Sequence, residues 1–275
     1  MHSYKVQTKD HIILNVQKWN DTKTSKGTLF IIHGLGEHQG RYSHLAKFYI
    51  DNGFQVYSYD QRGHGKSEGK RGHSPSLDYS LDDLERVLKT IPYHNLFLYG
   101  HSFGGSLLLN FLLRKQPKFL KGAIVSAAWM KLIKKPSFIE LGLSKLMNGI
   151  YPGLTQNNKI DPNDFSYDPK VFTNYKEDLL NHNRISVRLF CEFYSAGKWA
   201  LENASKLCVN IFMFHGEEDA IICKSGSEYF AQSNKDKVTL KIFSNTKHEP
   251  HNDLTKKTVF ADTLNWLEEM LNIEE

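Results

Sequence analysis

The amino-acid sequence predicts an α/β protein in which helices cover both faces of a mostly parallel central sheet. Short apolar runs alternate along the chain with longer segments whose apolar residues recur at helical spacing. This alternation is typical of parallel sheets, because each crossover between parallel strands usually carries a helix. The chain has 275 residues, of which 40% are hydrophobic. That size and composition suit one large domain with an inserted segment.

The expected elements of the first half follow in chain order. Residues 5–20 alternate polar and apolar side chains, which favours one or two antiparallel edge strands. Residues 80–91 have Ser80 at a favourable N-cap position and acidic residues in the first turn, which predicts a helix. Further strands are expected at 28–34, 54–60, 95–100 and 120–127, and further helices at 44–53 and 106–116.

The alternation breaks after Ala128. Residues 129–205 contain helical stretches separated by Pro, Asn and Asp, and no buried strand is expected there. The pattern then resumes, with strands expected at 208–216 and 238–244 and helices at 225–234 and 258–272. We therefore expect residues 1–128 and 206–275 to form the core, and residues 129–205 to form a helical cap between two strands of one sheet.

Two segments match G-x-S-x-G, a pattern that can hold a nucleophilic serine on a sharp turn: residues 100–104 and residues 65–69. Short patterns arise by chance, so the flanking sequence decides between them. Ser102 follows an apolar run and precedes a leucine-rich segment that Pro117 closes, which predicts strand, turn and helix. Ser67 lies in a Gly-rich, charged stretch without a helix signal, so we expect it in a loop.

A serine nucleophile needs a base, an acid that orients the base, and donors for the oxyanion. In α/β-hydrolases the chain order is serine, acid, histidine, and sites gather at the carboxyl ends of the strands. The segment HGEEDAII follows a strand and offers Asp219 as the acid, with Glu217 and Glu218 expected in solvent. His248 follows the last strand and is the expected base, with His251 as its rival.

The oxyanion hole is expected to use two backbone amides. Phe103, the residue after the nucleophile, would supply one, and Leu35 in the early loop HGLGEH would supply the other. The histidines His33, His101 and His215 lie in or beside strands, so we expect them to pack around the site. This chemistry requires no metal and no organic cofactor, and none is expected.

The chain resembles the monoacylglycerol lipase and lysophospholipase family of α/β-hydrolases in five segments that stand in the family's order: HGLGEHQGRY, DQRGHGKSEGKRGH, GHSFGG, HGEEDAII and KHEPHN. The resemblance implies the α/β-hydrolase fold, with a mostly parallel central sheet flanked by helices and an inserted helical cap. It implies a triad of Ser102, Asp219 and His248, with the oxyanion amides named above. It also implies that the loop with Ser67, after the strand-end Asp60, is scaffold.

Members of that family bind a glycerol head group with polar residues that correspond here to Glu37, Arg41, Tyr175 and His251. Tyr175 begins YKEDLL, which is similar to the family's Y-x-x-D-P-L stretch except that Leu179 replaces the proline. The resemblance implies hydrolysis of the carboxylic esters of single-chain lipids, either monoacylglycerol or lysophospholipid, through an acyl-enzyme on the nucleophilic serine. A small-ester carboxylesterase or a thioesterase would use the same catalytic groups. A ligand receptor of the same fold would bind without rapid turnover.

One segment of the insertion bears on the substrate. Residues 137–154 carry apolar side chains at spacings of three, four and seven, which gather on one helical face. That face either packs on the core, or walls an acyl tunnel and lets the cap contact a membrane surface. The residues of this face are Ile139, Leu143, Leu146, Met147 and Ile150.

Composition excludes other classes of function. The net charge is +5, but the basic residues are scattered, whereas nucleic-acid binding requires a concentrated basic patch. The three cysteines, Cys191, Cys208 and Cys223, lack metal-site spacing and are expected to be free thiols. No signal peptide and no apolar stretch of about 18 residues is visible. We expect a cytoplasmic protein, peripheral to membranes at most, and the sequence does not indicate its oligomeric state.

Overall fold

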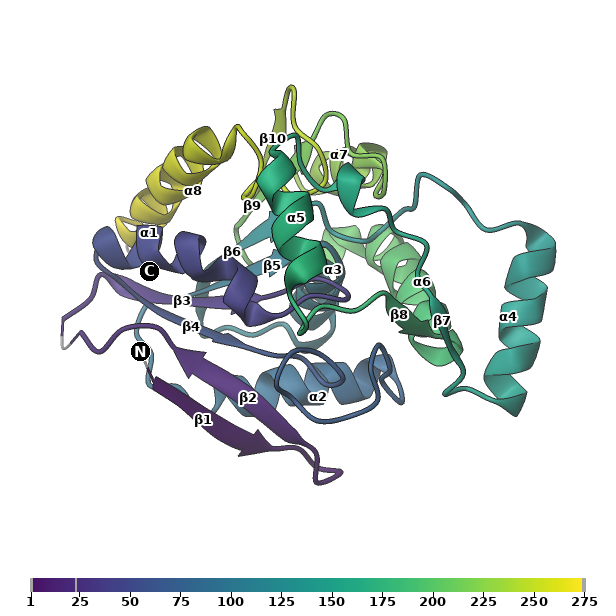
Figure 1. The fold of residues 1–275 in the computed structure, drawn as a ribbon. Helices are drawn as coiled ribbons and strands as arrows, with labels where there is room; N and C mark the ends of the chain where they lie inside the picture. Colours follow the sequence, from purple (N-terminus) through teal and green to yellow (C-terminus); the bar gives the residue numbers. More distant parts are fainter. Residues whose placement is uncertain (1, 23, 274–275) are drawn as a thin grey trace.

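The central sheet of the computed structural model, which describes residues 2–22 and 24–273, has eight strands in the order β1-β2-β4-β3-β5-β6-β9-β10 (Figure 1). β1 and β2 form an antiparallel hairpin, β2 runs antiparallel to β4, and every other neighbouring pair is parallel. The sheet therefore confirms the predicted mostly parallel α/β fold with an antiparallel edge. The strand bounds are β1 His2–Gln7, β2 Ile13–Lys18, β3 Gly27–Ile32, β4 Phe54–Tyr59, β5 Leu96–His101, β6 Leu120–Ser126, β9 Ile211–Gly216 and β10 Val238–Phe243.

Helices cover both faces of the sheet, so the parallel strands are buried on both sides. One apolar cluster joins the sheet to α1 (Ser43–Asp51) and α8 (Lys256–Leu271). The other joins it to α2 (Leu77–Leu88), α3 (Ser102–Lys115), α6 (Val187–Glu202) and α7 (Lys224–Gln232). The central strands β3 and β5 are buried at every position, as expected for strands with a helical layer on each face.

The N-cap of helix α2 lies four residues before the one that the sequence predicts. Its N-cap is Ser76, whose backbone is extended and whose hydroxyl accepts a hydrogen bond from Tyr79 N at 3.3 Å. The predicted cap, Ser80, lies inside the helix, and its hydroxyl pairs with Ser74 Oγ at 2.9 Å. The prediction failed here because two serines four residues apart both suit an N-cap, and burial of Leu77 favours the earlier start.

The segment between β6 and β9 contains α4 (Phe138–Ile150), α5 (Pro169–Glu177) and α6, with the 3₁₀ turns η2 (Pro162–Asp164) and η3 (Ala204–Lys206). It also contains two short strands, β7 (Thr155–Asn157) and β8 (Arg184–Ser186), which pair antiparallel. The expectation of no buried strand in this segment holds for β7, in which no residue is buried, and is wrong for β8, in which Ile185 and Ser186 are buried. Three-residue strands are too short for a periodic signal, and their pairing joins residues about thirty positions apart.

Helix α4 stands apart from the body of the molecule at the right of Figure 1, and none of its residues is buried. Its apolar face is exposed: Ile139 is 84% accessible, Leu143 58%, Leu146 60% and Ile150 70%. Of the two alternatives for this face, packing on the core is therefore excluded. A capping box between Ser137 and Glu140 starts the helix, so the helix forms without burying its apolar side.

No helix in the described residues is both long and apolar enough to cross a membrane. The three cysteines are free thiols, as predicted from their spacing.

Candidate active site

Ser102 lies on a strained turn between β5 and α3, with a φ of +51° that non-glycine residues rarely adopt. Glycines make this turn fit against its surroundings. A Cβ atom at Gly104 would lie 2.4 Å from the carbonyl oxygens of Ile32 and His33, and one at Gly100 would lie 2.7 Å from Gly104 O. The G-x-S-x-G segment at 100–104 thus has the strand–turn–helix context that the sequence predicts for a nucleophile.

Ser67, in the other G-x-S-x-G match, has a different environment. It is buried, its hydroxyl donates to Asp60 O at 2.5 Å, and its oxygen accepts from Asn15 N at 2.8 Å. The bond from Asn15 ties the loop after β4 to β2, and the bond to Asp60 closes that loop on the end of β4. The Ser67 hydroxyl is therefore engaged with main-chain groups, which fits the scaffold role expected of it.

The structure brings together the three side chains predicted as nucleophile, base and acid. His248 Nε2 lies 2.9 Å from Ser102 Oγ, and His248 Nδ1 lies 2.7 Å from Asp219 Oδ2. A carboxylate can only accept, so Nδ1 carries the proton and donates, and Nε2 has its lone pair toward the serine hydroxyl. Asp219 Oδ1 accepts from the amides of Ile221 and Ile222 at 2.8 and 2.9 Å. The carboxylate is thereby held in one orientation.

Electrostatics favour an ionised acid beside a basic imidazole. Burial alone would raise the pKa of Asp219, but the charge of His248 and hydrogen bonds from His215 and His248 hold it well below its usual range. Burial alone would lower the pKa of His248, but the charge and hydrogen bond of Asp219, with the charges of Glu249 and Glu37, raise it. An imidazolium formed on His248 is therefore stabilised.

His215 at the end of β9 contacts the same oxygen of Asp219 as the base does. Its Nε2 lies 2.9 Å from Asp219 Oδ2 and 3.1 Å from Ile222 O, both acceptors, so Nε2 carries the proton. Its Nδ1 pairs with Ser227 Oγ at 2.9 Å. The prediction that His215 packs around the site is confirmed. Glu217 and Glu218 are exposed, also as predicted.

The two predicted oxyanion donors lie on segments that meet at Ser102. Phe103 is in the first turn of α3, where amides have no intrahelical acceptor and the helix dipole favours negative charge. Leu35 follows Gly34, and a Cβ atom built on Gly34 would lie 3.5 Å from Ser102 Cβ. Gln61 N donates to His33 Nε2 at 2.9 Å, so His33 Nδ1 is protonated and donates to Gly34 O at 2.8 Å. This bond orients the peptide group whose N–H belongs to Leu35.

The residues that the resemblance assigns to a head group lie beside this loop, and three of them are engaged with protein groups. Glu37 accepts from Gly34 N at 2.5 Å and contacts Arg41. The Tyr175 hydroxyl donates to Gly36 O at 3.0 Å. His251 is fully buried next to His101, with ring centroids 4.6 Å apart, and neither of its ring nitrogens has a hydrogen-bond partner. Whether these residues bind a head group stays a prediction.

Sequence reasoning missed Glu249, the residue after the candidate base. Its carboxylate accepts two hydrogen bonds from Arg41, at 2.9 and 2.7 Å, and one from Asn252 Nδ2 at 2.6 Å. Its amide donates to Phe165 O at 2.8 Å, which joins the loop after β10 to the insertion. The signal was present in KHEPHN, where a charged residue directly follows the candidate base.

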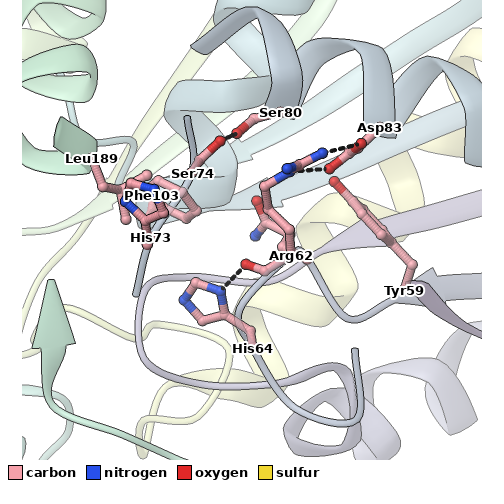
Figure 2. A pocket seen from close by; sticks show the side chains of 10 residues that line it. Tyr59, Arg62, His64, His73, Ser74, Ser80, Asp83, Phe103 and Leu189 are labelled. Atoms are coloured by element: carbon pink, nitrogen blue, oxygen red, sulfur yellow. Dashed lines mark hydrogen bonds and ion pairs between the residues drawn. The ribbon is translucent and has the colours of Figure 1, made fainter. Parts of the chain in front are cut away.

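Two cavities were found whose lining does not include Ser102. The smaller, about 10 Å³, has room for about one water molecule and is lined by Phe103, His64 and the Arg62–Asp83 ion pair, among others (Figure 2). The larger is a groove of about 800 Å³ beside α6, whose wall includes Leu141 of α4. In the described part of the chain, no group of three or more His, Cys, Asp or Glu side chains is placed to hold a metal ion.

Comparison with known proteins places this site in a family. The family model described as Hydrolase_4, serine aminopeptidase S33, matches residues 23–255, which is most of the chain. The chain belongs to this family. It is an ester hydrolase of the monoglyceride lipase type, as the sequence resemblance implied.

Several members of known sequence or structure are similar to the chain. An uncharacterized abhydrolase domain-containing protein of Dictyostelium discoideum is 36% identical over 96% of this chain, which spans 28% of that protein's length. The monoacylglycerol lipase of Mycolicibacterium smegmatis is 27% identical, with 90% of each chain covered. The crystal structure of the monoacylglycerol lipase of Paleococcus ferrophilus superimposes with a TM-score of 0.85 at 29% identity, covering 98% of this chain and 100% of that one. These matches confirm the α/β-hydrolase fold.

Proposed function

We propose that the protein hydrolyses the carboxylic esters of single-chain lipids, monoacylglycerol or lysophospholipid, through an acyl-enzyme on Ser102. The observation that carries the proposal is the hydrogen-bonded chain from Ser102 Oγ through His248 to Asp219, at the start of α3. The class of substrate is supported by relatives named monoacylglycerol lipase and monoglyceride lipase, each about as long as this chain.

In the acylation step, His248 Nε2 removes the proton of Ser102 Oγ as the oxygen attacks the ester carbonyl carbon. The amides of Leu35 and Phe103 donate to the oxyanion that forms. Asp219 stabilises the imidazolium, because its pKa is held low and it stays ionised. The tetrahedral intermediate then expels the alcohol, which takes the proton from Nε2, and the acyl group stays on Ser102.

In the deacylation step, water enters where the alcohol has left. His248 Nε2 removes a proton from the water, which attacks the acyl carbon, and the same two amides hold the second oxyanion. The intermediate collapses to the carboxylic acid, and Ser102 Oγ recovers its proton from Nε2. No step uses a group outside the protein and its two substrates.

Residues 129–205 would act as the cap of this site, with residues 1–128 and 206–275 as the core. The exposed apolar face of α4 would contact the surface of a membrane or a lipid aggregate, where single-chain lipid esters are concentrated. Each CH₂ of an acyl chain that is buried under the cap would add about 0.8 kcal/mol of binding. Transfer of four carbons would therefore favour the longer ester by roughly 3 kcal/mol, or about a hundredfold in kcat/KM if the transition state keeps the contact.

A small-ester carboxylesterase is the second candidate. The same family resemblance also extends to an enzyme named caffeoylshikimate esterase, from Arabidopsis thaliana, at 26% identity. A thioesterase would share the acyl-enzyme.

A substrate panel separates these functions. Initial rates are measured with mono-, di- and triacylglycerols, lysophospholipids and p-nitrophenyl esters of increasing chain length, all below their critical micelle concentrations. We expect kcat/KM to rise from short to long monoacyl esters, with triacylglycerol a poor substrate. A flat or falling profile would favour the small-ester carboxylesterase, and saturable binding without turnover would favour a receptor.

A further inference from the structure

The loop that carries Leu35 is anchored on its near side by groups of the core. His33 Nδ1 donates to Gly34 O at 2.8 Å, and Gly34 N donates to Glu37 Oε1 at 2.5 Å. Burial lowers the pKa of His33, so the ring stays neutral and keeps the tautomer that makes this contact. The peptide group between Gly34 and Leu35 is thus fixed from the side of β3.

The far side of the same loop is anchored by the insertion. Gly36 O accepts from the Tyr175 hydroxyl at 3.0 Å and from His182 N at 2.8 Å. Gly36 has a φ of +75°, and a Cβ atom there would lie 2.2 Å from His182 O and 3.2 Å from the Tyr175 hydroxyl. The loop and the segment 175–182 are therefore in direct backbone contact, and only glycine fits between them.

Tyr175 itself is held in place by several neighbours. Its ring meets Phe165 edge-on at 5.0 Å, and the Arg41 guanidinium lies 5.0 Å from the ring centre. Burial raises the pKa of Tyr175, so its hydroxyl remains a donor over the working pH range. A hydrogen bond of 2.7 Å from His38 Nε2 to Asp178 Oδ2 holds the same segment against the loop, and His38 Nδ1 accepts from Gly40 N at 3.1 Å.

We propose that Tyr175 is a positioning residue for the oxyanion hole: by holding the Gly36 carbonyl, it keeps the Leu35 amide aligned with Ser102. The inference rests on the proposed function, because it takes the Leu35 amide to be an oxyanion donor. Donors of this kind act through fixed placement, so a small displacement of the loop lowers the rate of the chemical step. The insertion then contributes to transition-state stabilisation as well as covering the site.

This role differs in a measurable way from contact with a head group. A residue that contacts glycerol affects only substrates that contain glycerol. A residue that positions the oxyanion amide affects every ester, because each ester passes through the same oxyanion. It acts on kcat more than on KM, since the loop is displaced whether or not a ground-state substrate is bound.

The test compares Tyr175→Phe with wild type on two esters of one acyl chain, a 1-monoacylglycerol and the matching p-nitrophenyl ester. Removing one hydroxyl keeps the ring contacts with Phe165 and Arg41. We expect kcat to fall about three- to tenfold on both esters, with KM within about twofold. Tyr151→Phe, an exposed tyrosine of the same insertion, is the control and should change neither. Thermal unfolding of each variant is recorded to establish that it is folded.

A second variant, Asp178→Asn, and a second reaction, with a fluorophosphonate, test the same role independently. Asp178→Asn weakens the contact with His38 and should lower kcat in the same direction on both esters, by a smaller factor. The rate at which a fluorophosphonate phosphonylates Ser102 should fall with Tyr175→Phe too, because that reaction uses the oxyanion donors but has no glycerol.

Each other result overturns the inference. A loss confined to the monoacylglycerol, with the p-nitrophenyl ester and the phosphonylation rate unchanged, would make Tyr175 a head-group residue. Unchanged kcat on both esters would mean that the hydrogen bond to Gly36 plays no part. If only the proposed lipid substrate is wrong, wild type will cleave the p-nitrophenyl ester and not the monoacylglycerol. The kcat of Tyr175→Phe on the p-nitrophenyl ester then still tests the positioning role. A wild-type protein that neither cleaves an ester nor reacts with the probe would overturn both.

Discussion

Arg41 and Glu249 form a bidentate ion pair directly beside the candidate base, with Nη1–Oε1 and Nη2–Oε2 distances of 2.9 and 2.7 Å. Arg41 also contacts Glu37, so one guanidinium stands between two carboxylates. All three groups are largely buried, and together they carry one net negative charge. In a medium of low polarity that charge favours the protonated form of His248, which lies next to Glu249 in the chain.

Glu249→Gln should therefore move the acid limb of the pH–rate profile to lower pH. The charge of Glu249 raises the pKa of His248, and its removal lets that pKa fall, so the neutral base persists to a lower pH. We expect the midpoint of kcat/KM against pH to move to lower pH. The charges of Asp219 and Glu37 remain, so they still raise the pKa of His248 in the variant.

The measurement uses a soluble p-nitrophenyl ester between pH 4 and 9, with Glu217→Gln as the control because Glu217 is exposed. Loss of a buried ion-pair partner can destabilise a protein by about 3–5 kcal/mol, so circular dichroism must show that the variant is folded at each pH. A midpoint that stays in place or moves to higher pH would contradict the electrostatic role of Glu249.

The two G-x-S-x-G serines should respond differently to alanine. Ser102→Ala is expected to lower kcat by a factor on the order of 10⁶, as loss of the nucleophile does in other serine triads. Ser67→Ala removes two buried hydrogen bonds and should lower the free energy of unfolding by about 1–3 kcal/mol, while the folded protein keeps most of its activity. Initial rates and urea unfolding measure the two effects. Similar losses of kcat in both folded variants would be inconsistent with a scaffold role for Ser67.

Among the three acidic residues after β9, Asp219 should be the sensitive one. Asp219→Asn keeps the shape but lets a donor face His248 Nδ1, which disfavours the required tautomer, so a loss on the order of 10⁴ in kcat is expected. Glu217→Gln and Glu218→Gln alter exposed side chains and should leave kcat within about twofold. If Glu218→Gln were the most damaging of the three, the acid would have to be reassigned.

The apolar face of α4 should govern binding to lipid surfaces. Leu146→Asp places a charge on the exposed apolar face. Burial of one leucine side chain in a lipid surface is worth about 1.5–3 kcal/mol, so its loss should weaken vesicle binding by at least tenfold. Turnover of a short, soluble ester should not change. Ser144→Asp puts the same charge on another side of the helix and serves as the control. Equal sedimentation of wild type and Leu146→Asp with phosphatidylcholine vesicles would refute this role for the face.

The order of strands and helices could be predicted because local patterns set it. An apolar run before Gly100 and a leucine-rich run after Gly104 suffice to predict the turn that carries Ser102. The placement of Asp219 and His248 followed from strand ends, since parallel strands bring their carboxyl ends to one edge. These features depend on residues close together in the chain.

Contacts between distant segments could not be predicted in the same way. The pair of Arg41 and Glu249 joins positions 208 residues apart, and the hydrogen bond from Tyr175 to Gly36 spans 139 residues. β7 and β8 are each three residues long, so their pairing leaves no periodic signal. The apolar face of α4 was predicted as a face, but amphipathic spacing alone does not tell whether that face is buried by protein or left exposed.

The identity of the acylated residue is the most direct test of the whole account. The protein is reacted with a fluorophosphonate, its intact mass is measured, and the modified residue is located by peptide sequencing in wild type and in Ser102→Ala. We predict a single adduct on Ser102 in wild type, faster when His248 is neutral, and no adduct in Ser102→Ala. An adduct on Ser67 or another residue, or ester hydrolysis that survives in a folded Ser102→Ala protein, would contradict the account.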